Sequence, residues 1–176
     1  SPTGGGDSSS VSHFLSSGVS QIYSTSSAFA ALKEDGSVIT WGGSSYGGDS
    51  SSIINSLSSG VIEIYSNYYA FAALKDDGSV VTWGSPTGGG DSSSVSSSLS
   101  SGVSQIYSNN SSFAALKDDG SIVTWGNSQY GGDSSSVSGQ LSSAVSQIYA
   151  SNGAFAALKE DGSVVTWGEN LFGGDS

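Results

Sequence analysis

The chain has 176 residues, a formal net charge of −11 and hydrophobic residues at only 35% of its positions. Four Lys or Arg stand against fifteen Asp or Glu, so no basic patch is available, which argues against nucleic acid and against an anionic membrane as partners. Cys is absent, which excludes disulfides and thiolate metal sites.

A strict repeat of 42 residues organises the chain, and it is clearest in the spacing of Trp41, Trp83, Trp125 and Trp167. A period in the range of about 20 to 50 residues indicates a repeat architecture. The four copies cover residues 1–42, 43–84, 85–126 and 127–168, and residues 169–176 restart the unit. With no break in composition, we expect one domain spanning 1–176.

Each copy contains three predicted strands. In the first copy, residues 19–23 form the first, residues 29–33 the second and residues 37–41 the third. The dipeptide Asp35-Gly36 separates the second from the third, and Gly accepts the positive φ that a tight hairpin turn requires. The sequence therefore predicts an antiparallel sheet that recurs four times.

The fourth segment of the unit, residues 49–57 in the first full example, is less regular. It is either an edge strand or a short helical turn with Asp or Ser as its N-cap. The match between the last eight residues and the first eight also has two readings. The chain is a window of a longer array, or its two ends together complete one repeat. Because Met is absent, we expect processing or excision from a longer chain.

Small sheets of this kind are marginal alone, and stacking them around an axis buries both faces of each. We therefore expect an all-β fold, a β-propeller of four blades with three or four antiparallel strands each. The chain is then a four-bladed ring or half of an eight-bladed dimer, and we favour a dimeric or larger assembly, including a longer array, over a lone ring. A β-solenoid is the alternative, but the hairpin turn argues against it.

Residues 31–42, Ala-Leu-Lys-Glu-Asp-Gly-Ser-Val-Ile-Thr-Trp-Gly, resemble a blade of the regulator-of-chromosome-condensation family of β-propellers. Residues 47–50, Gly-Gly-Asp-Ser, stand where that family has Gly-Gln-Leu-Gly. The resemblance implies a propeller, and the family usually has seven blades. Its best-known member is an exchange factor for a small GTPase on chromatin. No residue for that role matches here, and the negative charge argues against chromatin.

The copies differ in their loops, where binding specificity usually lies. Several of these variable positions carry aromatic or amide side chains, which suit contacts with carbohydrate or protein. About half of the aromatic ones are expected simply to fill space between blades. The candidate binding-loop residues are His13, Phe14, Tyr46, Tyr68, Tyr69, Asn109, Asn110, Tyr130, Asn152 and Phe172.

No catalytic, cofactor-binding or metal-binding residue is predicted. His13 is the single histidine, and other residue types replace it in the other copies, so we interpret it as a variable-loop residue. The Asp of Gly-Gly-Asp-Ser has the oxygen chemistry of a Ca²⁺ ligand, but one carboxylate per loop makes a poor cage. We expect it to bind turn amides or the single Lys of its blade.

The sequence favours a non-enzymatic binding scaffold, secreted or at the cell surface, that recognises a protein or glycan through its variable loops. The alternative is a structural element: a self-assembling homo-oligomeric ring or filament, or a fragment of a longer propeller array. An enzyme such as a glycosidase is the third hypothesis, and it needs two acids at a unique site. Only Glu63 and Glu169 lie outside the repeated acidic positions.

Overall fold

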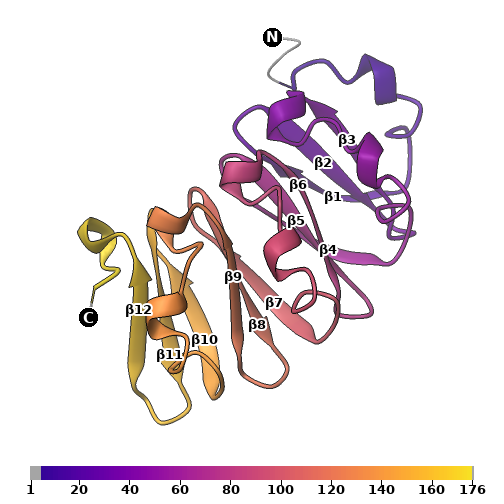
Figure 1. The fold of residues 1–176 in the computed structure, drawn as a ribbon. Coiled ribbons are helices and arrows are strands. Elements are labelled where there is room, and N and C mark those ends of the chain that lie inside the picture. The colour runs from indigo at the N-terminus through magenta and orange to yellow at the C-terminus, as the bar shows by residue number, and fades with distance from the viewer. Residues whose placement is uncertain (1–4, 176) are drawn as a thin grey trace.

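The computed structural model describes residues 5–175 and contains four antiparallel sheets of three strands, one per repeat (Figure 1). We call these sheets blades 1 to 4. The strands are β1 (Val19–Ser24), β2 (Ala28–Lys33), β3 (Val38–Gly42), β4 (Val61–Ser66), β5 (Ala70–Lys75), β6 (Val80–Gly84), β7 (Val103–Ser108), β8 (Ser112–Lys117), β9 (Ile122–Gly126), β10 (Val145–Ala150), β11 (Ala154–Lys159) and β12 (Val164–Gly168). The predicted all-β fold with four blades is confirmed.

The register within each blade places the large aromatic residues together. In blade 2, Phe71 of β5 lies directly opposite Trp83 of β6. Cross-strand partners point to the same face of a sheet, and the two rings stack with their centroids 5.1 Å apart. The same pair stacks in the other three blades. The repeated Phe and Trp therefore form one aromatic layer per blade.

The fourth segment of the repeat contains short 3-10 helices in place of a strand. These are η2 (Ser9–Val11), η4 (Ser51–Ile53), η6 (Ser93–Val95) and η8 (Ser135–Val137). Four more 3-10 helices lie just before the Gly-Gly pairs: η3 (Ser44–Tyr46), η5 (Pro86–Gly88), η7 (Ser128–Tyr130) and η9 (Asn170–Phe172). Before η4, a carboxylate oxygen of Asp49 accepts a hydrogen bond from the amide of Ser51 at 2.9 Å. Of the two expectations, the helical turn is correct, and each described blade has three strands.

The Gly-Gly pair lets the chain pass from one blade to the next. Gly47 has φ of +95°, and a Cβ built there would lie 2.6 Å from the Phe71 ring. A Cβ at Gly48 would lie 2.4 Å from the backbone of Gly42. Only glycine fits such close approaches. The motif is thus explained by packing and by backbone conformation.

Three hydrophobic junctions join successive blades, and in each the same repeat positions meet. The second and third strands of one blade supply small and aliphatic side chains, and the next blade supplies aromatic and larger aliphatic ones. The first junction buries Ala28, Ala30, Leu32 and Val38 of blade 1 against Leu57, Val61, Ile64, Phe71 and Trp83 of blade 2. The second and third junctions repeat this arrangement.

Backbone hydrogen bonds also join the blades along their inner edge, where β1, β4, β7 and β10 are neighbours. The turns after these strands form a ladder. Ser26 N donates to Tyr68 O at 3.1 Å, Tyr68 N to Asn110 O at 3.2 Å, and Asn110 N to Asn152 O at 3.2 Å. This ladder lies beside the axis of the propeller and fixes the spacing of the blades.

The blades form an open arc, with blade 1 and blade 4 at its two ends (Figure 1). Among residues 5–175, the three buried clusters join blades 1 and 2, 2 and 3, and 3 and 4. The outward faces of the two end blades carry exposed hydrophobic residues, among them Ile22 and Val164. In this part of the chain, no helix has the length and apolar character needed to cross a membrane.

Candidate binding face

The four helices η3, η5, η7 and η9 lie at one end of the blades, beside the turns that join the first and second strands. Between them is a cavity of about 700 Å³. Six of the ten predicted binding residues line this cavity, although they come from separate loops of the sequence. These are Tyr46, Tyr68, Tyr69, Asn110, Tyr130 and Phe172.

A polar residue in each inner turn holds the neighbouring 3-10 helix in place. In blade 2 this residue is Asn67, which is buried. Its Nδ2 donates to Gly88 O at 2.7 Å, and its Oδ1 accepts from the amides of Tyr69 and Ala70, each at 2.8 Å. Since both halves of the side-chain amide are bonded to the backbone, Asn67 couples the turn to η5.

The other blades make the equivalent contact with a Thr, an Asn and a Ser side chain. Thr25 Oγ1 donates to Tyr46 O at 3.0 Å, and Ser151 Oγ donates to Phe172 O at 2.9 Å. Asn109 donates from Nδ2 to Tyr130 O, and its Oδ1 accepts from two turn amides. Asn109 is therefore a buried positioning residue whose side chain is fully used within the fold.

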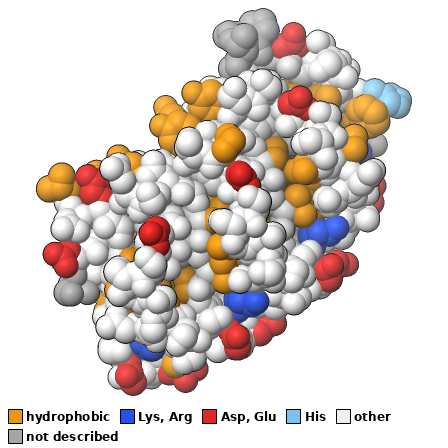
Figure 2. All heavy atoms as spheres, in the orientation of Figure 1, with side chains coloured by type: hydrophobic (Ala, Val, Ile, Leu, Met, Phe, Trp, Pro, Cys, Tyr) orange, Lys and Arg blue, Asp and Glu red, His pale blue; other side chains and the backbone are white. Residues whose placement is uncertain are grey.

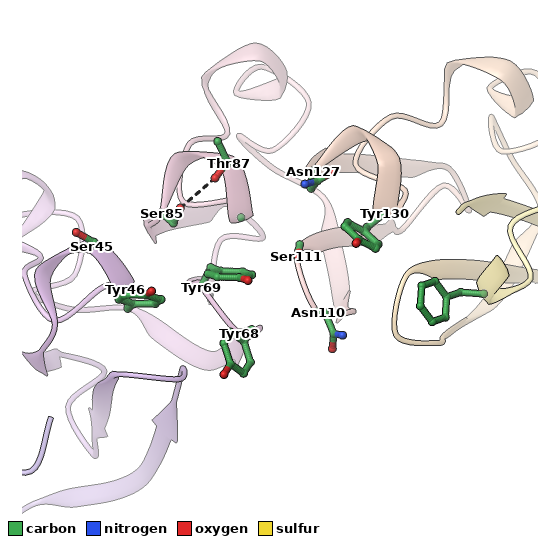
Figure 3. A pocket seen from close by; sticks show the side chains of 12 residues that line it. Ser45, Tyr46, Tyr68, Tyr69, Ser85, Thr87, Asn110, Ser111, Asn127 and Tyr130 are labelled. Atoms are coloured by element: carbon green, nitrogen blue, oxygen red, sulfur yellow. Dashed lines mark hydrogen bonds between the residues drawn. The ribbon is translucent and has the colours of Figure 1, made fainter. Parts of the chain in front are cut away.

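Three tyrosines form one wall of the cavity (Figure 3). Tyr46 and Tyr69 stack with centroids 6.0 Å apart and planes 22° apart. Tyr68 meets Tyr69 edge to face at 5.1 Å. Tyr69 thus lies between two rings, and this packing limits its rotamers.

The opposite wall carries Tyr130 and Phe172, whose ring centroids are 6.4 Å apart. Hydroxyl and amide groups also line the cavity, including Ser85 and Thr87 above the tyrosines and Asn127 above Tyr130 (Figure 3). The sequence analysis did not name these three residues, although it expected binding specificity in the loops that vary between copies. Among residues 5–175, no charged residue lines the cavity.

Three predicted residues lie away from this cavity. His13 and Phe14 are exposed at the opposite end of blade 1, where Lys33 Nζ donates to Phe14 O at 2.9 Å. The histidine projects from the edge of the molecule (Figure 2). Asn152 lies on the last inner turn and borders a separate polar recess of about 550 Å³, together with Asn109 and Asn110.

The repeated carboxylates are bound by turns. Asp35 Oδ1 accepts from both Ser37 Oγ at 2.6 Å and Ser37 N at 3.0 Å. The hydroxyl and then the amide of Ser37 lower the pKa of Asp35 below its usual range. The prediction that Asp49 binds a turn amide is confirmed. Among residues 5–175, no three His, Cys, Asp or Glu side chains gather to hold a metal ion.

No family model matches the sequence, and no curated protein matches it. Similarity is found among solved structures. Yeast Prp20p (RCC1) is 18% identical with a TM-score of 0.58, over 86% of this chain and 44% of that one. Human WBSCR16 is 20% identical with a TM-score of 0.52, over 88% and 48%. The ectodomain of the Arabidopsis thaliana receptor kinase ACR4 is 15% identical with a TM-score of 0.53, over 85% and 52%.

These similarities confirm that the chain has an RCC1-like β-propeller repeat fold. The chain spans about half the length, or less, of the structures it matches. At this level of sequence identity, the likeness concerns the fold of the blades, and function has to be argued from the site.

Proposed function

We propose that this chain is a non-enzymatic β-propeller scaffold that binds a neutral glycan in the cavity between η3, η5, η7 and η9. One observation carries this proposal. Five aromatic rings and several hydroxyl and amide groups line the cavity, and the part of the chain that the structure describes places no charged residue there, although the net charge of the chain is −11. The ligand that fits such a lining is uncharged, partly apolar and rich in hydroxyl groups.

A sugar ring has these properties on opposite sides. Its C–H face packs against an aromatic ring, while its hydroxyl groups bind amide and hydroxyl side chains. Tyr69 supports stacking because two other rings hold it in place, so little rotamer entropy is lost on binding. Asn110 and Asn127, on either side of Ser111, supply hydrogen-bonding groups at the middle of the cavity.

The lining also favours binding over hydrolysis. Glycosidases use two carboxyl groups roughly 5 to 10 Å apart, one of them a general acid. The cavity is lined by tyrosine, phenylalanine, serine, threonine, asparagine and glycine. Glu63, one of the two unrepeated acids, is an exposed residue of β4 and accepts a hydrogen bond from Tyr65 at 2.6 Å. We therefore assign no catalytic step to this face.

A protein partner is the second candidate. The structures of yeast RCC1 that resemble this chain describe it bound to Kap60 and binding Gsp1p and histones. Exposed tyrosines are frequent in protein interfaces. A protein ligand of this chain would bury Tyr68 and Phe172 at the rim. Either ligand is consistent with a secreted or cell-surface location, which stays a proposal.

The test is a calorimetric titration of the full chain with a panel of neutral oligosaccharides: glucans, mannans, galactans and chitin fragments. We expect binding by at least one class. Tyr69→Ala and Tyr130→Ala should each weaken it by about tenfold or more, the effect of losing one stacking contact of about 1.4 kcal/mol. Phe14→Ala is the control, because Phe14 is an exposed aromatic residue at the other end of blade 1.

Binding that Tyr69→Ala and Tyr130→Ala leave unchanged would remove the cavity as the site. If no oligosaccharide of the panel bound, the glycan proposal would be overturned. If a purified protein partner then bound, and the same two substitutions weakened it while Phe14→Ala did not, the second candidate would replace the first.

A further inference from the structure

The outward face of blade 1 is an interblade face without a neighbour. Ile22 on this face is 62% exposed, whereas its equivalents Ile64, Ile106 and Ile148 are each 2% exposed in the three junctions. Leu15 and Val19 are partly exposed, whereas Leu57 and Val61, their equivalents in the first junction, are buried. The residue types are the same, and the difference is that no other part of residues 5–175 packs against this face.

The outward face of blade 4 is the complementary half. Val164 is 56% exposed, whereas its equivalent Val38 is 7% exposed in the first junction. Tyr149 is exposed too, whereas Tyr23, Tyr65 and Tyr107 are partly buried. Burial raises the pKa of all three junction tyrosines. In blades 1 to 3 this face packs against the next blade. In blade 4 the same face is exposed.

We propose that two copies of this chain join head to tail, with blade 4 of each against blade 1 of the other, and close an eight-bladed ring. The two new junctions then repeat the three internal ones position for position. The occupant of each open face is a second copy because both halves of the junction are already present in one chain. Such heterologous contacts form a closed ring when the rotation between copies allows it.

The backbone hydrogen-bond donors and acceptors at the two faces are complementary as well. In the first junction, Val38 N donates to Leu57 O at 2.9 Å, and Val61 N donates to Gly36 O at 3.0 Å. The equivalent groups at the ends have no interblade partner within residues 5–175. Blade 4 offers Val164 N, Gly162 O and Asn152 N, and blade 1 offers Leu15 O, Val19 N and Ser26 O. Each donor thus meets an acceptor across the proposed junction.

The number of blades selects two copies. Propellers typically have about four to eight blades, and residues 5–175 contribute four to each copy. Two copies give a ring at the upper end of that range, and three would exceed it. Closing the ring removes both exposed apolar faces, and it also completes the ladder of inner turns through Asn152 N and Ser26 O.

At the proposed junction, the segment around Gly5 and the segment around Gly173 compete for the same place. Gly5 O accepts from Trp41 Nε1 at 3.0 Å within blade 1, and Gly173 is the equivalent residue after blade 4. A Cβ at Gly173 would meet nothing within 4 Å, whereas one at Gly5 would lie 2.8 Å from Phe29. Only one of the two segments can occupy the place beside Trp41. We infer that Gly5 of the second copy keeps it and that Gly173 of the first lies aside.

The test begins with native mass spectrometry and light scattering of the full chain over a wide dilution series. We expect a species of about 35.2 kDa, twice the 17.6 kDa chain, that dissociates on dilution. A monomer at every concentration would overturn the proposal. So would masses that keep growing with concentration, because open filaments need junctions that do not close.

Two matched substitutions locate the interface. Ile22→Asp places a carboxylate in the proposed junction and should weaken the dimer by about tenfold or more, because an unpaired buried charge is costly. Ile62→Asp is the control: Ile62 is 57% exposed, also on a first strand, and lies outside the junction clusters. Circular dichroism should show both variants folded. Equal effects of the two substitutions on the dimer would contradict the proposed face.

A mixing experiment tests the head-to-tail geometry. The variants Ile22→Asp and Val164→Asp should each be largely monomeric alone. Mixed, they can form one intact junction between the unaltered blade 4 of the first and the unaltered blade 1 of the second. We expect a heterodimer that neither variant forms by itself. Failure to form it, when both variants are folded, would overturn the heterologous junction.

Discussion

Trp83 donates a hydrogen bond from its indole Nε1 to the carbonyl oxygen of Gly47, 36 residues earlier and 3.0 Å away. The equivalent bond recurs in the other three blades. It ties the third strand of a blade to the Gly-Gly linker that enters it, while the indole stacks on Phe71. One residue thus satisfies a backbone carbonyl and fills the aromatic layer of its blade.

Trp83→Ala should therefore destabilise the fold far more than Tyr68→Ala. Trp83 is 4% exposed and Tyr68 is 58% exposed. We expect a loss of about 3–5 kcal/mol for the first and about 0.5 kcal/mol or less for the second. Chemical denaturation followed by circular dichroism measures both. Similar losses in the free energy of unfolding would contradict the assignment of Trp83 to the scaffold and Tyr68 to the binding face.

Ala144→Gly should stabilise the chain. Ala144 is the only non-glycine residue with positive φ among the described residues, at 61°, and its equivalent Gly102 has φ of 71°. Relief of this left-handed strain is worth about 1 kcal/mol, which should raise the melting temperature by about 2–4 °C in a domain of this size.

The reverse change, Gly102→Ala, is the matched control for the same backbone position. A Cβ at Gly102 would have 3.6 Å to its nearest neighbour, so crowding adds nothing, and we expect a loss of about 1 kcal/mol. A higher melting temperature in Gly102→Ala, measured by differential scanning fluorimetry, would contradict the role of φ here.

Asn67→Ala should affect both stability and binding. The substitution removes three hydrogen bonds: one to Gly88 O of η5 and two from the turn amides of Tyr69 and Ala70. Leaving buried backbone groups unpaired costs about 1–3 kcal/mol. Asn152→Ala, at an exposed turn position, should leave stability within about 0.5 kcal/mol. Thermal unfolding compares the two, and equal melting temperatures would argue against Asn67 as a positioning residue.

Acid should destabilise the hairpin turns in a predictable direction. Ser37 holds the pKa of Asp35 below its usual range, and the turns of the other blades do the same. The folded pKa lies below the unfolded one, so this contribution is fully present above about pH 3.9 and is lost as pH falls through the folded pKa.

Ser37→Ala isolates this effect, because it removes the hydroxyl that is the largest cause of the shift. The parent chain should lose more stability than the variant between about pH 5 and pH 3. Chemical unfolding at a series of pH values measures the difference. A greater loss in the variant would reverse the sign that the turn geometry requires.

The sequence predicts the blades well, because strand pattern and the Asp-Gly turn are local signals that repeat four times. The register of Phe71 with Trp83 follows from the turn between them. The helical turn at Ser51–Ile53 could not be separated from a strand, because its Ser-rich sequence has no clear period. The open arc could not be predicted from the sequence either, because ring closure depends on the rotation between successive blades.

The site was only partly predictable. Variation between copies identified Tyr46, Tyr69 and Tyr130, but it could not show that they share one cavity, since that depends on how η3, η5 and η7 sit on their blades. The same criterion selected Asn109, which varies yet is buried. Its turn tolerates any residue that bonds a carbonyl, so variability there reflects interchangeable positioning groups.

The most direct test of the binding proposal is a nuclear magnetic resonance titration of the full chain, with its aromatic rings labelled, against the best neutral oligosaccharide from the panel. The account predicts shifts of the Tyr46, Tyr69 and Tyr130 rings, which saturate together, while Phe14 stays unchanged. Shifts confined to rings outside the cavity, or none at saturating sugar, would contradict it.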